Sequence, residues 1–109
     1  MTNYPYPARS EGEIQKGICQ YLASKGYFFW REGNQRRVFI GKHIKSRYEV
    51  NGKPDLFVFD GSVTYALEIK TKKGKQSDNQ KVFEEEWSVP IVRIYRIIRS
   101  LEDVMEMGL

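Results

Sequence analysis

Apolar residues recur at helical spacing between residues 14 and 22, where they lie three or four positions apart. This period predicts an amphipathic helix. Ser10 is suited to cap its N-terminus, with Glu13 three residues later to complete a capping box, and Gly26 is suited to end it. Residues 1–9, which include two prolines, are expected to form an extended lead-in.

Beyond this helix the apolar residues come in short runs, which predict β-strands. Asp60-Gly61, between two of the runs, is typical of a hairpin turn. A second helix is expected to open at Ser77 and to run to about Trp87, and Ser100 would cap a short terminal helix. The predicted strands span residues 27–30, 55–59, 63–70 and 91–95, and residues 38–40 are a candidate further strand.

The order of these elements is helix, three or four strands, helix, strand and helix, without a repeat or a linker. A chain of 109 residues is long enough to bury a hydrophobic core of its own. We therefore expect residues 1–109 to form a single α/β domain, in which a mixed β-sheet is flanked by helices.

Composition narrows the class of protein. Hydrophobic residues make up 40% of the chain, which is typical of a globular protein rather than a disordered one. Cys19 is the only cysteine and His43 the only histidine, so neither an intrachain disulfide nor a Cys/His zinc site can form. No apolar run reaches membrane-spanning length and the first residues lack a signal-peptide core, so we expect a cytoplasmic protein. The net charge of +4 mildly favours a polyanionic partner.

Polar side chains gather at one end of the predicted hairpin. Because side chains alternate along a strand, Glu68 and Lys70 share one face of the strand 63–70. A four-residue loop would place Asp55 opposite Glu68, and a two-residue loop would place it opposite Ala66. Two adjacent carboxylates repel each other unless a cation offsets them, so this arrangement suits a divalent metal. The pattern alone is equally compatible with a structural interpretation, in which Glu68 and Lys70 lie on a solvated strand face and Asp55 is an acidic turn residue.

Four ordered motifs carry a resemblance to a known family. Pro54-Asp55 followed by Glu68-Ile69-Lys70 matches the PD-(D/E)XK nuclease signature. The wider layout resembles the VRR-NUC branch, the virus-type replication-repair nuclease domain. The resemblance covers roughly residues 10–107 and rests on Glu11-x-x-Ile14-Gln15, Gly52-x-Pro54-Asp55-Leu56, Glu68-Ile69-Lys70 and Ser77-x-x-Gln80. It implies a restriction-endonuclease-like core, metal-dependent phosphodiester hydrolysis and, as in stand-alone members, a homodimer similar to Holliday-junction resolvases.

The resemblance also implies roles for these residues. Asp55, Glu68 and the Ile69 carbonyl would hold Mg²⁺ or Mn²⁺, which prefer oxygen ligands. Glu11 would approach from the first helix as a further ligand, directly or through a water molecule. Lys70 would orient or deprotonate the attacking water, or stabilise the negatively charged transition state.

Three other residues have competing interpretations. Gln80 and Gln15 are suited to position water, Lys70 or a phosphate oxygen, but Gln80 is also suited to a capping box. Glu13 is the alternative to Glu11, which fits the spacing of the family motif better.

Basic residues flank the candidate site in two groups, as a protein that grips a phosphate backbone requires. Singly, each is as compatible with a solvated surface. Residues 32–51, which carry most of the first group, would form either a junction-gripping hairpin or a disordered loop. The first group is Arg31, Arg36, Arg37, Lys42, Lys45 and Arg47, and the second is Lys70, Lys72, Lys73 and Lys75.

Taken together, the sequence predicts a metal-dependent, structure-specific DNA endonuclease that acts on branched DNA such as Holliday junctions, in a bacterial or phage-infected cell. The alternative is a catalytically inactive DNA-binding or assembly module on the same fold. RNA cleavage is weaker, because nothing in the sequence addresses a 2′-hydroxyl.

Overall fold

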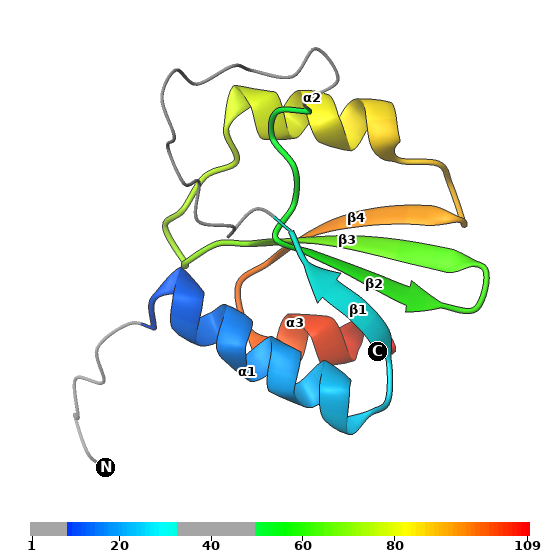
Figure 1. The fold of residues 1–109 in the computed structure, drawn as a ribbon. Coiled ribbons are helices and arrows are strands. Elements are labelled where there is room, and N and C mark those ends of the chain that lie inside the picture. Colours follow the sequence, from blue (N-terminus) through cyan, green and yellow to red (C-terminus); the bar gives the residue numbers. More distant parts are fainter. Residues whose placement is uncertain (1–8, 33–49) are drawn as a thin grey trace, which may run out of the picture.

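A computed structural model describes residues 9–32 and 50–109, so the candidate strand at residues 38–40 lies outside the described residues. The rest of the element order is the predicted one (Figure 1). Along the chain the elements are α1 (Glu11–Ser24), β1 (Phe28–Arg31), β2 (Leu56–Asp60), β3 (Val63–Ile69), α2 (Asp78–Trp87), β4 (Arg93–Ile98) and α3 (Leu101–Glu106).

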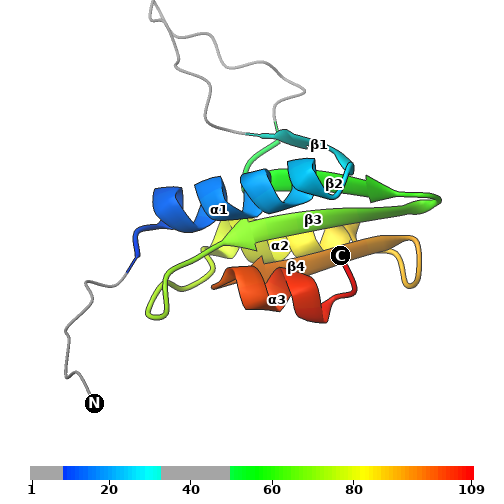
Figure 2. The ribbon, with the colours of Figure 1, turned by 90° about the horizontal axis from the view of Figure 1, so that it is seen from below.

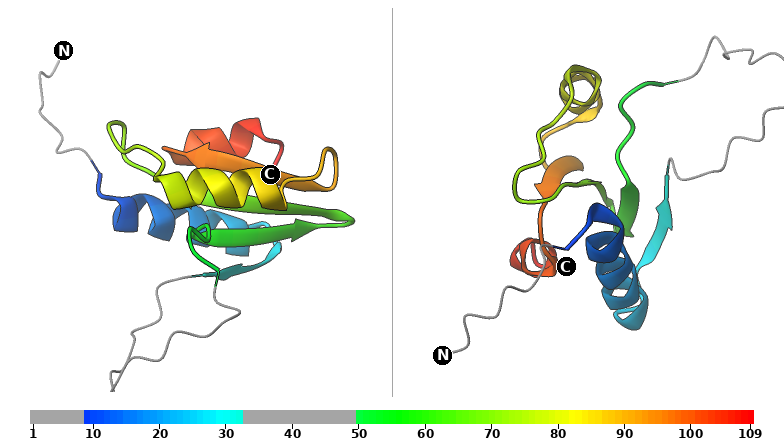
Figure 3. Two further views of the ribbon diagram at one scale, coloured as in Figure 1. Left: turned by 90° about the horizontal axis from the view of Figure 1, so that it is seen from above. Right: turned by 90° about the vertical axis from the view of Figure 1, so that its left-hand side faces the viewer.

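The four strands form one mixed sheet in the order β1-β2-β3-β4. The β1–β2 and β2–β3 pairs are antiparallel, and β3 and β4 are parallel because α2 crosses over between them. Helices α1 and α3 lie side by side on one face of the sheet (Figure 2). Helix α2 covers the opposite face, so the fold has three layers (Figure 3). This architecture confirms the predicted α/β class with helices on both faces of a mixed sheet.

The main hydrophobic core lies between the sheet and the pair α1 and α3. Ile18 and Leu22 of α1 are fully buried against Leu67 of β3 and Val104 of α3. The hydroxyls of Tyr21 and Tyr27 donate to the main-chain carbonyl of the last residue, at 3.1 and 3.2 Å, and so tie the C-terminus to the α1 side of the fold. Among the described residues, no helix is long and apolar enough to span a membrane.

Helix α2 packs more loosely on its face of the sheet. None of its residues is fully buried. Its contact runs through aromatic pairs: Trp87 lies 5.8 Å from Phe57 on β2, and Phe83 lies 6.2 Å from Tyr95 on β4, between ring centroids. The space beneath α2 therefore holds polar as well as apolar side chains, and Glu68 is one of them.

The last strand differs from the prediction, which placed it at residues 91–95. It spans Arg93–Ile98 because the chain first makes a tight turn, in which Val92 N donates to Val89 O at 3.2 Å. Pro90 and Ile91 occupy the central positions of that turn, and Ile91 has a φ of 76°. The apolar run was the correct signal, but Pro90 starts a turn rather than the strand itself.

Candidate active site

Asp55 lies beside Glu68 at the open end of the β2–β3 hairpin. The ladder pairs Asp60 with Val63 and continues to Leu56 with Leu67, so only Gly61 and Ser62 remain in the turn. The register is the predicted one in which Asp55 lies opposite Glu68, although the turn has two residues rather than four. Asp55 directly precedes this ladder, and its own N–H donates to the Leu67 carbonyl at 3.0 Å. The two carboxylates are therefore brought together by backbone pairing.

The side chain of Asp55 is fixed as well. Its Oδ2 accepts a hydrogen bond of 2.8 Å from the main-chain N–H of Ile69, and its carbonyl accepts one of 2.7 Å from Glu32 N. Since the N–H and C=O of one strand residue point to the same side, the Ile69 carbonyl also faces the Asp55 side of β3. The candidate ligands are thus aimed at one region.

Gly52 explains how the loop before Asp55 reaches its position. It has a φ of +74°, and a Cβ there would lie 2.3 Å from the main-chain oxygen of Asn79. Only glycine allows the loop to pack against the first turn of α2 with this backbone conformation. Pro54, which follows in the motif, is fully buried. Each named residue of the Gly-x-Pro-Asp motif therefore has a structural role in this loop.

Glu68 is the most unusual group of the site. It is only 3% exposed, and its Oε1 has no hydrogen-bond partner among the described residues. Lys70 Nζ lies 3.8 Å from Oε2. The pKa of Glu68 is raised to about 8. Burial is the largest cause, the Asp55 carboxyl contributes through hydrogen bonding and repulsion, Glu11 adds a smaller repulsion, and Lys70 opposes these effects.

These features fit a divalent cation. A buried carboxylate with an unpartnered oxygen is costly unless it is protonated or meets a cation. Within residues 9–32 and 50–109, however, no three Asp, Glu, His or Cys side chains form a ready metal cage. Asp55, Glu68 and the Ile69 carbonyl would then supply part of the coordination, and solvent or substrate oxygens the rest, as Mg²⁺ commonly accepts.

The helix residues of the candidate site are placed unequally. Glu11 is exposed at the start of α1 and acts on Glu68 through its charge. Glu13 forms the capping box with Ser10, whose N–H it accepts at 3.3 Å, so this alternative to Glu11 serves the helix end. Gln15 is 6% exposed and lies among the buried residues of α1.

Gln80 forms a capping box, which was one of the two roles predicted for it from the sequence. Its Oε1 accepts from Ser77 N at 2.8 Å and its N–H donates to Ser77 Oγ at 3.1 Å, which completes a capping box at α2. The backbone of Gln80 also lies against Gly52, in the loop that carries Asp55. Its side-chain oxygen is used by the cap, which leaves the amide nitrogen for any role in the site.

A buried polar network beside Glu68 was not expected from the sequence. Gln76 Nε2 donates to Tyr95 Oη at 3.3 Å and to Glu84 Oε1 at 2.9 Å. Tyr95 is 3% exposed, and burial raises its pKa to about 12, with the charges of Glu68, Glu84 and Asp55 acting in the same direction and Gln76 opposing. The available signal was a tyrosine among the isoleucines of the last strand.

The two basic groups are only partly visible. Lys72, Lys73 and Lys75 are exposed on the loop that leaves β3, at the same end of the sheet as Glu68. Arg31 is exposed at the end of β1. The remaining predicted DNA-binding residues lie outside the described residues: Arg36, Arg37, Lys42, Lys45 and Arg47.

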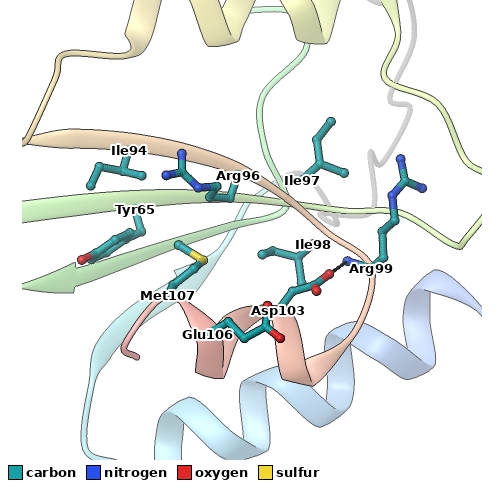
Figure 4. A pocket seen from close by; sticks show the side chains of 9 residues that line it. All are labelled: Tyr65, Ile94, Arg96, Ile97, Ile98, Arg99, Asp103, Glu106 and Met107. Atoms are coloured by element: carbon teal, nitrogen blue, oxygen red, sulfur yellow. Dashed lines mark hydrogen bonds between the residues drawn. The ribbon is translucent and has the colours of Figure 1, made fainter.

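A cavity of about 490 Å³ lies between β4 and α3 (Figure 4), and neither Asp55 nor Glu68 lines it. Its lining includes Asp103, Glu106 and Arg96. Asp103 already accepts from the main-chain N–H of Arg99 at 2.8 Å. The acidic residues of this lining lie among apolar and cationic neighbours and include neither acid of the β2–β3 hairpin, so the cavity is separate from the candidate site.

The fold and the paired carboxylates define a class: a restriction-endonuclease-like α/β core with a mixed four-stranded sheet. More particularly, the chain has the fold of a solved structure described as a VRR_NUC domain, with a TM-score of 0.62 and 19% sequence identity over 90% of this chain and 92% of that one. No family model matches the sequence, and no curated protein matches it. The identification made from the motifs is therefore confirmed at the level of the fold.

Proposed function

We propose that the protein is a divalent-metal-dependent DNA endonuclease that hydrolyses phosphodiester bonds, preferably in branched DNA such as a four-way junction. The observation that supports this most directly is the convergence of Asp55, Glu68 and Lys70 at the end of the β2–β3 hairpin. These three residues are the acid-acid-lysine set of the resemblance to VRR-NUC domains.

The metal would be Mg²⁺ or Mn²⁺, held by Asp55, Glu68 and the Ile69 carbonyl, with Glu11 as a more distant contributor. When bound, it would supply positive charge to polarise the phosphoryl oxygen and to make water more acidic. The Asp55 carboxylate would be held in position as a ligand by the Ile69 N–H, which donates to its Oδ2. Glu68 provides a carboxylate whose burial makes its ionised form dependent on a cation.

Lys70 would act on the substrate itself. Its side chain is 13% exposed and lies 3.8 Å from Glu68, so the ammonium is held near the acidic pair but remains accessible. From there it would orient the attacking water or donate hydrogen bonds to the phosphate oxygens as they gain negative charge. Gln80 and Gln15 would support this arrangement from α2 and α1.

DNA is the proposed partner because the lysines that follow β3 present positive charge at the same end of the sheet. A homodimer is proposed on the resemblance and on symmetry. A four-way junction offers two equivalent strands to cut, and a two-fold dimer offers two equivalent sites.

A cleavage panel tests the proposal. Purified protein would be incubated with four-way, flap, single-stranded and linear DNA, with Mg²⁺, Mn²⁺ or EDTA. We expect cleavage only with metal, strongest on branched DNA, and at least about 100-fold slower for Lys70→Ala. Lys25→Ala, at the other end of α1, is the control with the same loss of charge. Binding of branched DNA without cleavage under every condition would instead identify an inactive DNA-binding module.

A further inference from the structure

A second cavity lies between the first half of α1, the loop that follows β3 and the start of α3. Its volume is about 580 Å³. The residues that line it include Arg9, Gly17, Lys72, Arg99, Leu101 and Glu102. Figures 1 and 2 both show the loop beside the N-terminal end of α1. The cavity therefore opens at the carboxyl ends of the parallel strands β3 and β4, where ligands of α/β proteins commonly bind.

The charge of this cavity favours an anion. Three of its side chains are cationic, Arg9, Lys72 and Arg99, and one, Glu102, is acidic. Ile14 and Leu101 provide an apolar wall. Cations that converge on a concave surface raise the local concentration of a phosphate group more than the same charges spread over a flat one.

Arg99 holds the loop that brings Lys72 to the cavity. Its Nη1 donates to three main-chain carbonyls of the loop: those of Thr71, Lys72 at 3.3 Å and Gly74 at 2.9 Å. The main-chain N–H of Arg99 is itself held by the Asp103 carboxylate. Figure 4 shows the Arg99 side chain pointing away from Asp103. Lys72 is thus attached to an ordered backbone, which reduces the entropy that it loses when it binds a ligand.

Gly17 keeps the cavity open on the side of α1. No atom lies within 4 Å of the position that a Cβ would occupy there. Glycine in the middle of a helix is destabilising relative to alanine, because it loses more backbone freedom on folding. The φ of Gly17 is not in the left-handed region, so backbone geometry does not require this glycine.

We propose that this cavity binds a backbone phosphate of the DNA strand, with Arg9 and Lys72 as its cationic contacts and Arg99 as the residue that holds the Lys72 loop in place. This inference rests on the proposed nuclease function and extends it. Lys72 follows Lys70 by two residues, so a phosphate held here would set the position of the strand relative to Asp55 and Glu68.

The test is DNA binding in EDTA, where cleavage does not interfere. Fluorescence anisotropy with a labelled four-way junction would be measured over a series of KCl concentrations. Arg9→Ala and Lys72→Ala are each expected to weaken binding on the order of tenfold and to lower the salt dependence by about one released counterion. Lys25→Ala removes the same charge away from the cavity and should change the affinity far less.

A pair of substitutions at Gly17 separates cavity shape from charge. Gly17→Met would project a long side chain into the cavity and weaken DNA binding, whereas Gly17→Ala would leave most of the space and bind normally. Thermal unfolding of both variants shows that the fold is intact.

The outcomes distinguish the two proposals. If the unaltered protein binds and cleaves DNA but Arg9→Ala and Lys72→Ala behave as Lys25→Ala does, the phosphate site is wrong and the nuclease proposal stands. If the unaltered protein does not bind DNA, both fail.

Discussion

Asp55 accepts a hydrogen bond of 2.8 Å from the main-chain N–H of Ile69, and this bond ties the first carboxylate of the site to the strand that carries the second. The main chain of Asp55 is bonded on both sides as well, to Leu67 and Glu32. Backbone hydrogen bonds therefore fix the main chain of Asp55 beside Glu68, and the Ile69 N–H orients the Asp55 carboxylate, as a preorganised site requires.

The coupling of the two carboxylates gives the first prediction. Asp55→Asn should lower the pKa of Glu68, because it removes a neighbouring negative charge and the hydrogen bond that favours the protonated form. The pKa should remain above 4.5, since burial is the largest cause of the shift. NMR titration of the Glu68 side-chain carboxyl carbon, in metal-free protein, measures it. Glu11→Gln is the control and should lower the pKa less.

Glu68 also predicts how stability depends on pH. Its pKa is raised from 4.5 to about 8 in the folded protein, so the folded state binds its proton more tightly than the unfolded state does. The stabilisation from this proton is complete below pH 4.5 and is lost as the pH rises towards 8. Within that window the group removes up to about 1.4 kcal/mol of unfolding free energy per pH unit.

Urea unfolding in EDTA at several pH values checks this sign. Glu68→Gln, which stays neutral, should unfold with a flatter pH dependence and should be more stable than the original protein at pH 8. A Glu68→Gln protein that lost as much stability over this window as the original would show that another group is responsible.

The affinity for a metal ion should depend on the protonation of Glu68 as well. Because a ligand carboxyl must ionise before it coordinates, the affinity for Mn²⁺ should rise as the pH approaches 8, by up to about tenfold per unit. Calorimetry in buffers of different ionisation enthalpy would measure about one proton released per metal ion. Asp55→Ala should abolish the binding. An affinity that did not change with pH would argue against Glu68 as a ligand.

Much of this site could be predicted from the sequence because it depends on local rules. Strand alternation and the hairpin turn place Glu68, Lys70 and Asp55 together, and the capping motif at Ser77 fixes the start of α2. The roles of Tyr95 and Arg99 could not be predicted in this way. Their partners, Gln76 and Gly74, lie on the connection between β3 and α2, and only the parallel crossover brings that connection near β4.

Boundaries were harder to predict than element types. The prediction began the last strand at residue 91, whereas a turn delays it to Arg93. The apolar run of Val, Ile and Pro is compatible with a turn as well as with a strand. The start of the strand is determined by its pairing with β3, which begins where Thr64 N donates to Val92 O, and this long-range contact cannot be read from the local sequence.

Gly52 gives a prediction about the loop that carries Asp55. Gly52→Ala would force a Cβ to within 2.3 Å of the Asn79 carbonyl oxygen, in addition to the strain of a φ of +74°. Gly61→Ala is the matched control, because its φ is +62° but nothing lies within 4 Å of its Cβ. We expect Gly61→Ala to cost about 1 kcal/mol and Gly52→Ala clearly more, by chemical denaturation.

The same pair of variants separates stability from activity. Gly52→Ala should also slow cleavage in the panel proposed above, since it displaces the loop that positions Asp55 against α2. Gly61→Ala, at the opposite end of the hairpin, should leave cleavage unchanged. Equal losses of activity in both variants would mean that the loop position is unimportant to the site.

Ile91 predicts a gain of stability. It is the third residue of the Val89–Val92 turn, has a φ of 76° and is 82% exposed, so it bears a left-handed backbone without a compensating burial of its side chain. The left-handed conformation costs a non-glycine residue roughly 1–2 kcal/mol. Replacement by glycine relieves this strain, but part of the gain is lost because glycine increases the conformational entropy of the unfolded chain. Ile91→Gly should therefore raise the unfolding free energy by about 1 kcal/mol, measured in urea. Ile91→Val, which keeps the β-branched side chain, should have almost no effect, and a loss of stability on Ile91→Gly would mean that the side chain contributes more than the turn geometry costs.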